Sequence, residues 1–158
     1  MHLDLDTFGD TIHGGNVARM YDKTAAVRGD APALESHGEE VTHEELQAVS
    51  SAFAGGLREL GVEETEPVML YLPNCPQYVI ASLGCFRAGS PVSPVNPQYR
   101  SRELVHQLTD TDAAAVITHV ALREHLGEAI DDIDGDPPVI TVGDREAMPE
   151  GDTHFDDV

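Results

Sequence analysis

The stretch from residue 66 to residue 96 constrains the fold more than any other part of the sequence. It opens with a short apolar run at 67–72, rich in Val, Leu and Tyr, which is typical of a buried strand. Residues 75–88 are apolar on nearly every face, and we expect them to form a buried helix with Asn74 as its N-cap. Gly89 ends that helix, and a second strand follows at once. This order predicts a parallel βαβ unit with a right-handed crossover.

The remaining sequence continues the alternation of strands and helices. Amphipathic spacing predicts further helices at residues 16–27, 42–60, 101–111 and 119–133. Apolar runs predict strands at residues 91–95, 113–118 and 138–142, and a hairpin formed by 33–36 and 40–42. The predicted fold class is α/β, with a mostly parallel sheet of about four strands flanked by helices and a small N-terminal hairpin.

Local signals mark where the helices begin. Asn16 and Ser101 are the expected N-caps of two of them. Thr42 and Glu45 form a capping-box pattern, in which each side chain reaches the backbone amide of the other residue. The helix that Thr42 opens carries one apolar stripe, made of Leu46, Val49, Phe53, Leu57 and Leu60.

The chain of 158 residues corresponds to one domain by length. Residues 1–15 carry no periodic signal, and we expect a loosely held leader there. The α/β unit is predicted to span residues 16–142. Residues 143–158 are acidic and without periodicity, and we expect a linker-like tail.

The charge of the chain is strongly acidic, with 29 Asp and Glu against 9 Lys and Arg and a formal net charge of -20. The acids are spread along the sequence and Lys23 is the only lysine, a composition that resembles proteins of salt-accumulating halophiles. A field of this sign disfavours nucleic acid and anionic membrane surfaces. No apolar run approaches the ~20 residues of a membrane span. We therefore expect no nucleic-acid partner, no membrane association and a cytoplasmic location.

The two cysteines, Cys75 and Cys85, lie on one predicted helix, about 15 Å apart along its axis. A disulfide requires Cα atoms within about 7 Å, so these two residues cannot pair with each other. We expect both to be buried, reduced and structural.

Ligands of an open parallel sheet bind beyond the carboxyl ends of its strands. A phosphate cradle at such an end needs glycines and free backbone N–H groups. The first turn of this chain instead holds Pro73 and Pro76, which lack that donor. Neither GxGxxG nor GxxxxGK[ST] occurs in the sequence. We therefore assign no catalytic, cofactor-binding or metal-binding residue.

Weaker candidates have simpler explanations. Arg100, Ser101 and Arg102 could hold one anion at a helix start, but a capping serine between two solvated arginines accounts for them. His119 beside Thr118 could be a base, yet nothing places a nucleophile or carboxylate next to it, and a capping or surface histidine suffices. Capping and solvation also account for the adjacent acids Glu44, Glu45, Asp131 and Asp132.

Five segments of the sequence, taken in order, resemble a known family. They are Thr42-His43-Glu44-Glu45-Leu46, Leu57 with Leu60-Gly61-Val62, Leu72-Pro73-Asn74-Cys75-Pro76, Arg87-Ala88-Gly89-Ser90-Pro91-Val92 with Pro94-Val95-Asn96-Pro97, and Glu103-Leu104. Their order and spacing resemble the N-terminal part of the adenylate-forming synthetases, over about residues 16–142. The Pro94-Val95-Asn96-Pro97 form resembles fatty-acyl and aryl CoA ligases more than amino-acid adenylating domains. His43 departs from the Tyr that is usual in the family, and Glu66-Pro67 departs from Gly-Asp.

Enzymes of that family activate a carboxylate with ATP and Mg²⁺ and then transfer the acyl group to a thiol, usually that of CoA. The resemblance implies that residues 16–142 are a partial N-terminal α/β subdomain. It also implies that the phosphate loop, the nucleotide contacts, the magnesium-linked glutamate and the catalytic lysine have no matching positions in this chain. ATP, Mg²⁺ and CoA are thus implied for a complete enzyme, and no cofactor for this chain.

Three hypotheses remain open. The chain is a structural fragment of an acyl-CoA synthetase, inactive alone, with a sheet edge and apolar patches that the missing part would cover. Alternatively, it is one chain of a split ligase whose C-terminal part is a separate polypeptide. The third hypothesis is a stand-alone nucleotide- or acyl-binding module that uses the rim around Asn74, Asn96 and His119.

Overall fold

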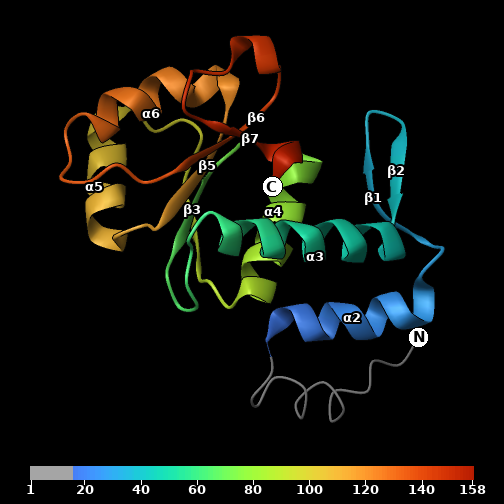
Figure 1. The fold of residues 1–158 in the computed structure, drawn as a ribbon. Coiled ribbons are helices and arrows are strands. Elements are labelled where there is room, and N and C mark those ends of the chain that lie inside the picture. The colour runs from blue at the N-terminus through green and yellow to red at the C-terminus, as the bar shows by residue number, and fades with distance from the viewer. Residues whose placement is uncertain (1–15) are drawn as a thin grey trace.

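Strand β3 (Val68–Tyr71) lies inside the central sheet, and all four of its residues are buried. The computed structural model describes residues 16–158, so the leader expected at 1–15 lies outside the described part. The sheet has the strand order β4-β3-β5-β6-β7, and every neighbouring pair is parallel (Figure 1). The other strands are β4 (Val92–Pro94), β5 (Ala115–His119), β6 (Val139–Val142) and β7 (Thr153–His154). The parallel α/β fold is confirmed.

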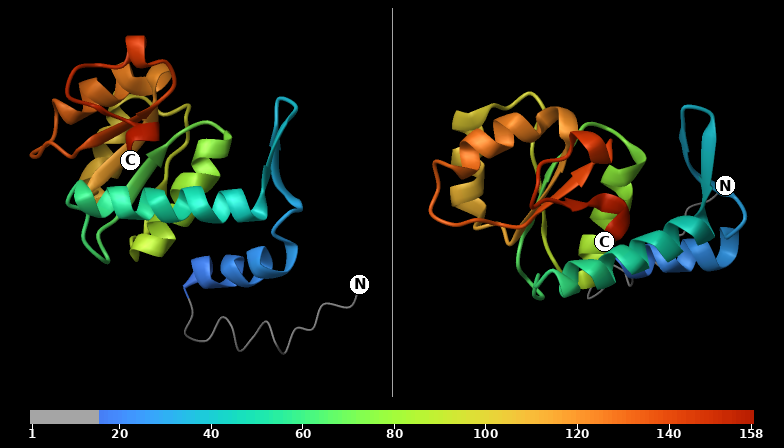
Figure 2. Two further views of the ribbon diagram at one scale, coloured as in Figure 1. Left: turned by 45° about the vertical axis from the view of Figure 1, so that its right-hand side comes forward. Right: turned by 45° about the horizontal axis from the view of Figure 1, so that its top comes forward.

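Helices cover both faces of this sheet (Figure 2). They are α3 (His43–Glu59), α4 (Pro76–Ala88), α5 (Ser101–Thr111) and α6 (Arg123–Ile130). Helix α2 (Val17–Arg28) packs against α3 and α4. Because side chains alternate along a strand, Val68 and Leu70 of β3 face the core under α3 and α4, whereas Met69 and Tyr71 face α5 and α6. Burial on both faces explains why the run at 67–72 is continuously apolar.

The local signals for turns and caps are largely confirmed. The amide of Glu45 donates to Thr42 Oγ1 at 3.2 Å, and the amide of Thr42 donates to Glu45 Oε2 at 2.8 Å. Asn16 caps α2 by accepting from the Ala18 amide at 2.8 Å. The hairpin of β1 (Pro32–Ser36) and β2 (Glu39–Thr42) turns at His37 and Gly38, whose φ angles are +53° and +84°. Two successive positive φ angles are typical of a type I′ turn.

Two of the expected N-caps are wrong by one residue. Cys75, and not Asn74, is the N-cap of α4, because the residue before a proline avoids helical dihedrals and Pro76 occupies the first helical position. Arg100, and not Ser101, precedes α5, and its amide donates to Glu103 Oε2 at 3.2 Å. The helix expected at 119–133 is a 3₁₀ turn at Val120–Leu122 followed by α6.

The acidic stretch at 143–158, expected to be linker-like, is folded against the rest of the chain. It forms β7, which pairs with β6 and gives the sheet a fifth strand where about four were expected. Arg123 donates to both carboxylate oxygens of Asp152 at 2.8 and 3.0 Å, and Thr141 Oγ1 donates to Asp152 Oδ2 at 2.6 Å. Phe155 is 6% exposed and stacks on Phe53 with ring centroids 4.6 Å apart.

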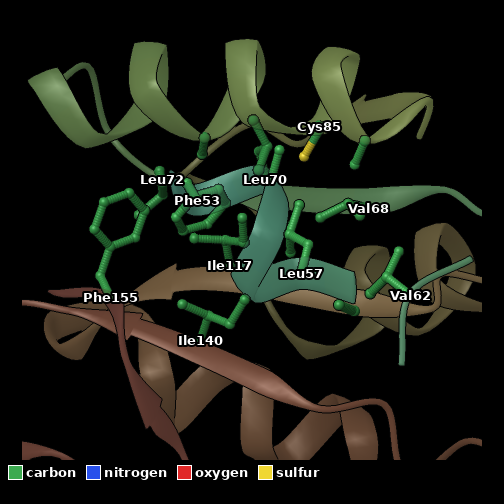
Figure 3. Close-up of a cluster of buried hydrophobic side chains, with 14 of the residues drawn as sticks. Phe53, Leu57, Val62, Val68, Leu70, Leu72, Cys85, Ile117, Ile140 and Phe155 are labelled. Atoms are coloured by element: carbon green, nitrogen blue, oxygen red, sulfur yellow. The ribbon is translucent and has the colours of Figure 1, made fainter. Parts of the chain in front are cut away.

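Helices α3 and α4 approach each other closely at Gly84, beneath the ring of Phe53. A Cβ atom at position 84 would lie 2.6 Å from Phe53 Cδ1. Figure 3 shows Phe53 between Phe155, Leu72 and Leu70 in the buried cluster on this side of the sheet. A residue larger than glycine at position 84 must displace this ring.

We expect Gly84→Ala to lower the free energy of unfolding by about 1–2 kcal/mol, because overpacking outweighs the helix propensity that alanine adds. The control is Gly55→Ala in α3, where nothing lies within 4 Å of the new Cβ. This control should raise the free energy of unfolding by up to about 1 kcal/mol. Urea unfolding in KCl measures both, and equal stabilisation by the two substitutions would contradict the close packing.

Removal of the Phe155 ring tests whether the last residues belong to the core. We expect Phe155→Ala to cost about 3 kcal/mol of unfolding free energy, because it deletes a buried ring and its stacking on Phe53. Val27→Ala is the control at an 84% exposed site and should change stability by less than about 0.5 kcal/mol. Unchanged stability of Phe155→Ala would mean that the stretch at 143–158 does not close the core.

Candidate functional site

The carboxyl end of the sheet between β3 and β5 is the candidate site by topology. Strands β4 and β5 lie on opposite sides of β3. The chain leaves β3 towards α4 on one face of the sheet and leaves β5 towards α6 on the other. Such a switch point is where open α/β sheets bind ligands. Tyr71 pairs with Thr118 here, and Thr118 Oγ1 donates to the Tyr71 carbonyl at 3.2 Å.

The turn after β3 leads into α4 through Asn74, Cys75 and Pro76. Asn74 is exposed and lies on a hollow of about 440 Å³ between the β1–β2 hairpin and the start of α4. Pro76 takes the first helical position, where a phosphate cradle would use an amide. The backbone at this turn is therefore poorly suited to holding a phosphate group.

The loop after β4 is held together by its own hydrogen bonds. The Tyr71 hydroxyl, buried beneath the loop, donates to the Tyr99 carbonyl at 2.7 Å. Arg100 Nη1 donates to the Pro97 and Tyr99 carbonyls at 3.2 and 2.7 Å. Burial raises the pKa of Tyr71, and the nearby Arg100 charge partly opposes this shift. Arg100 Nη1 therefore donates its hydrogen bonds to the loop itself and not to a bound anion.

Ser101 and Arg102 were the other two residues considered for an anion site. Ser101 Oγ donates to Glu128 Oε2, so this hydroxyl already meets a carboxylate. Arg102 is exposed on the first turn of α5. The expected capping serine is wrong, because Arg100 and not Ser101 precedes α5. Arg100 Nη1 and Ser101 Oγ already have hydrogen-bond partners within the chain.

His119 acts as a cap, as its simpler explanation proposed. Its Nδ1 accepts from the Ala121 amide at 3.1 Å at the start of the 3₁₀ turn. Gly143 passes so close that a Cβ there would lie 2.6 Å from Val120 Cγ2 and 3.4 Å from His119 Nε2. On the same rim, Asn96 Oδ1 accepts from the Gln98 amide at 2.9 Å. Both rim side chains thus stabilise their own turns.

A polar network joins α2, α3 and α4, and sequence reasoning missed it. Arg87 Nη2 lies 2.5 Å from Asp22 Oδ1, and Arg87 Nε donates to Ser50 Oγ at 3.0 Å. Gln47 Nε2 donates to the same Asp22 oxygen at 2.8 Å. The hydrogen bond from Arg87 is the main cause of the lowered pKa of Asp22. Asp22 and Arg87 lie 65 positions apart, so no local pattern in the sequence indicates this contact.

We also looked among the described residues for metal ligands, membrane-spanning helices and reactive cysteines. Among residues 16–158, no three His, Cys, Asp or Glu side chains are grouped so that they could hold a metal ion. Over the same residues, no helix combines the length and the apolarity needed to cross a membrane. Both cysteines are free, but only Cys85 is fully buried, whereas Cys75 at the start of α4 is half-buried.

Comparison with known proteins identifies the family. The family model described as "AMP-binding enzyme" matches residues 21–157. The chain belongs to the AMP-binding enzyme family. The resemblance found from the five sequence segments is thereby confirmed.

The curated relatives that this chain matches include CoA ligases. It is 35% identical over 134 residues to a long-chain-fatty-acid–CoA ligase of Escherichia coli O6:H1, covering 84% of this chain and 24% of the relative. It is 29% identical over 170 residues to 4-coumarate–CoA ligase 1 of Petroselinum crispum, covering 99% of this chain and 29% of the relative. A benzoate CoA ligase of Burkholderia xenovorans LB400 shares the fold, with a TM-score of 0.79, 24% identity, and coverage of 90% of this chain and 27% of that one. The chain thus spans about a quarter of the length of these relatives.

The two thiols should differ sharply in reactivity. Burial raises the pKa of Cys85 to about 12, and the thiolate is the form that reacts. At pH 8, we expect a disulfide reagent that reports released thiolate to modify Cys75 in the folded chain and Cys85 only after unfolding. Cys75→Ser should abolish the reaction of the folded chain. Equal reaction rates of both thiols without unfolding would contradict the buried position of Cys85.

Proposed function

We propose that this chain is the N-terminal part of an acyl-CoA synthetase and supplies framework to it. A complete enzyme of this kind would join a carboxylate to CoA with ATP and Mg²⁺. The observation that carries the proposal is the partial span: the 134 residues aligned to the Escherichia coli O6:H1 ligase make up 24% of that protein. The described part of this chain is built around a βαβ core and its covering helices.

The chain alone is proposed to be catalytically inactive. Its 158 residues contain neither of the two glycine-rich phosphate motifs. At the carboxyl end of the sheet, Arg100, Asn96 and His119 use polar atoms to stabilise local turns. Asn96 Oδ1, Arg100 Nη1 and His119 Nδ1 would each have to give up a hydrogen bond before that atom could contact a nucleotide. The same bonds weigh against the stand-alone binding module.

The proposed substrates are fatty or aryl carboxylates. The names of the relatives point to this class, because they include long-chain fatty acid and 4-coumarate ligases. The Pro94-Val95-Asn96-Pro97 segment favours the same class. The remainder of the ligase is proposed to follow in a longer chain or to act as a separate polypeptide in the cytoplasm.

Turnover by the isolated chain is the direct test. We expect no pyrophosphate release and no acyl-CoA when the chain is incubated with ATP, Mg²⁺, CoA and palmitate or 4-coumarate in molar KCl. The complete Escherichia coli O6:H1 ligase in its own buffer serves as the positive control for the assay. Formation of acyl-CoA by the 158-residue chain would overturn the proposal.

The acidic surface is proposed to be an adaptation to high salt. Repulsion among surplus acids is screened as the Debye length falls from about 10 Å at 0.1 M salt to about 3 Å at 1 M. We therefore expect the melting temperature to rise by several degrees between these KCl concentrations. A variant with Asn at the exposed positions Asp131, Asp132, Asp134 and Asp136 should show a shallower rise. Equal slopes for both proteins, or no rise at all, would contradict the proposal.

A further inference from the structure

A surface hollow of about 570 Å³ lies where the first half of α2 meets the C-terminal parts of α3 and α4. These three helices pack against one another, and α2 runs alongside α3 (Figure 1). Alanine and glycine supply much of the lining, at Ala18, Ala54, Gly55, Ala88 and Gly89. A Cβ atom at Gly55 would meet nothing within 4 Å, so the hollow is open above this part of α3.

Three arginines line this hollow, and we call it the arginine hollow after Arg19, Arg58 and Arg87. The chain has only nine Lys and Arg residues, so a third of them gather here. Arg19 on α2 and Arg58 on α3 are exposed, and among residues 16–158 their side chains have no hydrogen bond or ion pair. Each guanidinium presents a planar fork of donors that matches a carboxylate. Two such forks, on two different helices, are therefore available to a ligand.

The other charges of the arginine hollow leave it with a small positive excess. Arg87 is paired with Asp22, so these two charges cancel. Glu64 is the remaining acid in the lining, and its side chain lies over Gly89, where a Cβ atom would be 2.7 Å from Glu64 Cγ. The unpaired charges are thus two guanidinium groups and one carboxylate. On a chain with a formal net charge of -20, this is an exceptional local balance.

The arrangement of the two free forks narrows the choice of ligand. An anion with two separated carboxylates can engage both, while the alkyl chain between them lies on the alanine and glycine surface. A monocarboxylate can engage only one fork, and a phosphate group concentrates its charge at one point of a much larger hollow. The overall acidity of the chain repels any anion, but in molar salt that field decays within about 3 Å, and the nearest arginines then dominate.

We propose that the arginine hollow binds a short aliphatic dicarboxylate, with Arg19 and Arg58 each holding one carboxylate. This site lies beyond the proposed function. Its lining residues Glu64 and Gly89 precede β3 and β4, so the hollow is at the amino end of these strands. The candidate switch point lies at their carboxyl end.

The test is titration calorimetry of the chain with glutarate in molar KCl. We expect saturable binding of one glutarate per chain, weakened at least about 5-fold by Arg19→Gln and by Arg58→Gln, which each remove one fork. Glu64→Gln should tighten binding by about 3-fold, because it removes the opposing carboxylate. The control Arg28→Gln deletes an exposed arginine of α2 outside the hollow and should change the dissociation constant less than about 2-fold. Melting curves establish that each variant is folded.

Two further probes decide between ligand classes. Butyrate has one carboxylate fewer than glutarate and should bind at least about 5-fold more weakly. Butyrate binding as tight as that of glutarate, or tighter binding of inorganic phosphate, would assign the hollow to another anion and overturn the proposal. No saturable heat with glutarate, equal effects of Arg58→Gln and Arg28→Gln, or weaker binding by Glu64→Gln would also overturn it. The assay for acyl-CoA remains a separate test of the proposed function, whichever result is obtained here.

Discussion

Burial of strand β3 on both of its faces is the constraint on which the rest of the structure depends. Val68 and Leu70 need cover on one side of the sheet and Met69 and Tyr71 on the other. The crossover through α4 supplies the first cover, together with α3, and the crossovers through α5 and α6 supply the second. Because the chain leaves β3 and β5 towards opposite faces, the sheet gains a switch point at its carboxyl end as a by-product of covering its core.

That switch point is occupied by groups that stabilise the fold. Tyr71 is the last residue of β3, and its hydroxyl donates to the Tyr99 carbonyl in the loop after β4. Arg100 completes the same loop, and His119 caps the turn after β5. In a chain that spans about a quarter of its ligase relatives, these contacts are consistent with a scaffold whose reactive groups come from elsewhere in the enzyme. The position of the site is thus set by the fold, while its chemistry is not.

Local interactions explain what could be predicted from sequence. The capping box of Thr42 and Glu45 and the His37-Gly38 turn involve neighbours within a few residues, so their patterns are visible in the sequence. Alternation of apolar runs and amphipathic helices predicted four of the five strands, and burial on both faces leaves a strong signal in β3, β5 and β6, whereas β7 was missed. The prediction of Asn74 as the N-cap was wrong because Pro76 keeps the residue before it out of helical dihedrals. Cys75 is therefore the N-cap of α4, although Asn74 is the better capping residue by type.

Non-local contacts account for what could not be predicted. The stretch at 143–158 is fixed by the Phe155–Phe53 stack and by the ion pair of Asp152 with Arg123, which leave no periodicity in an acidic segment. The central claim is that these 158 residues provide framework without a nucleotide site. Titration calorimetry of the chain with Mg·ATP tests it most directly. The account predicts no saturable heat in molar KCl, and saturable binding of one nucleotide per chain would contradict it.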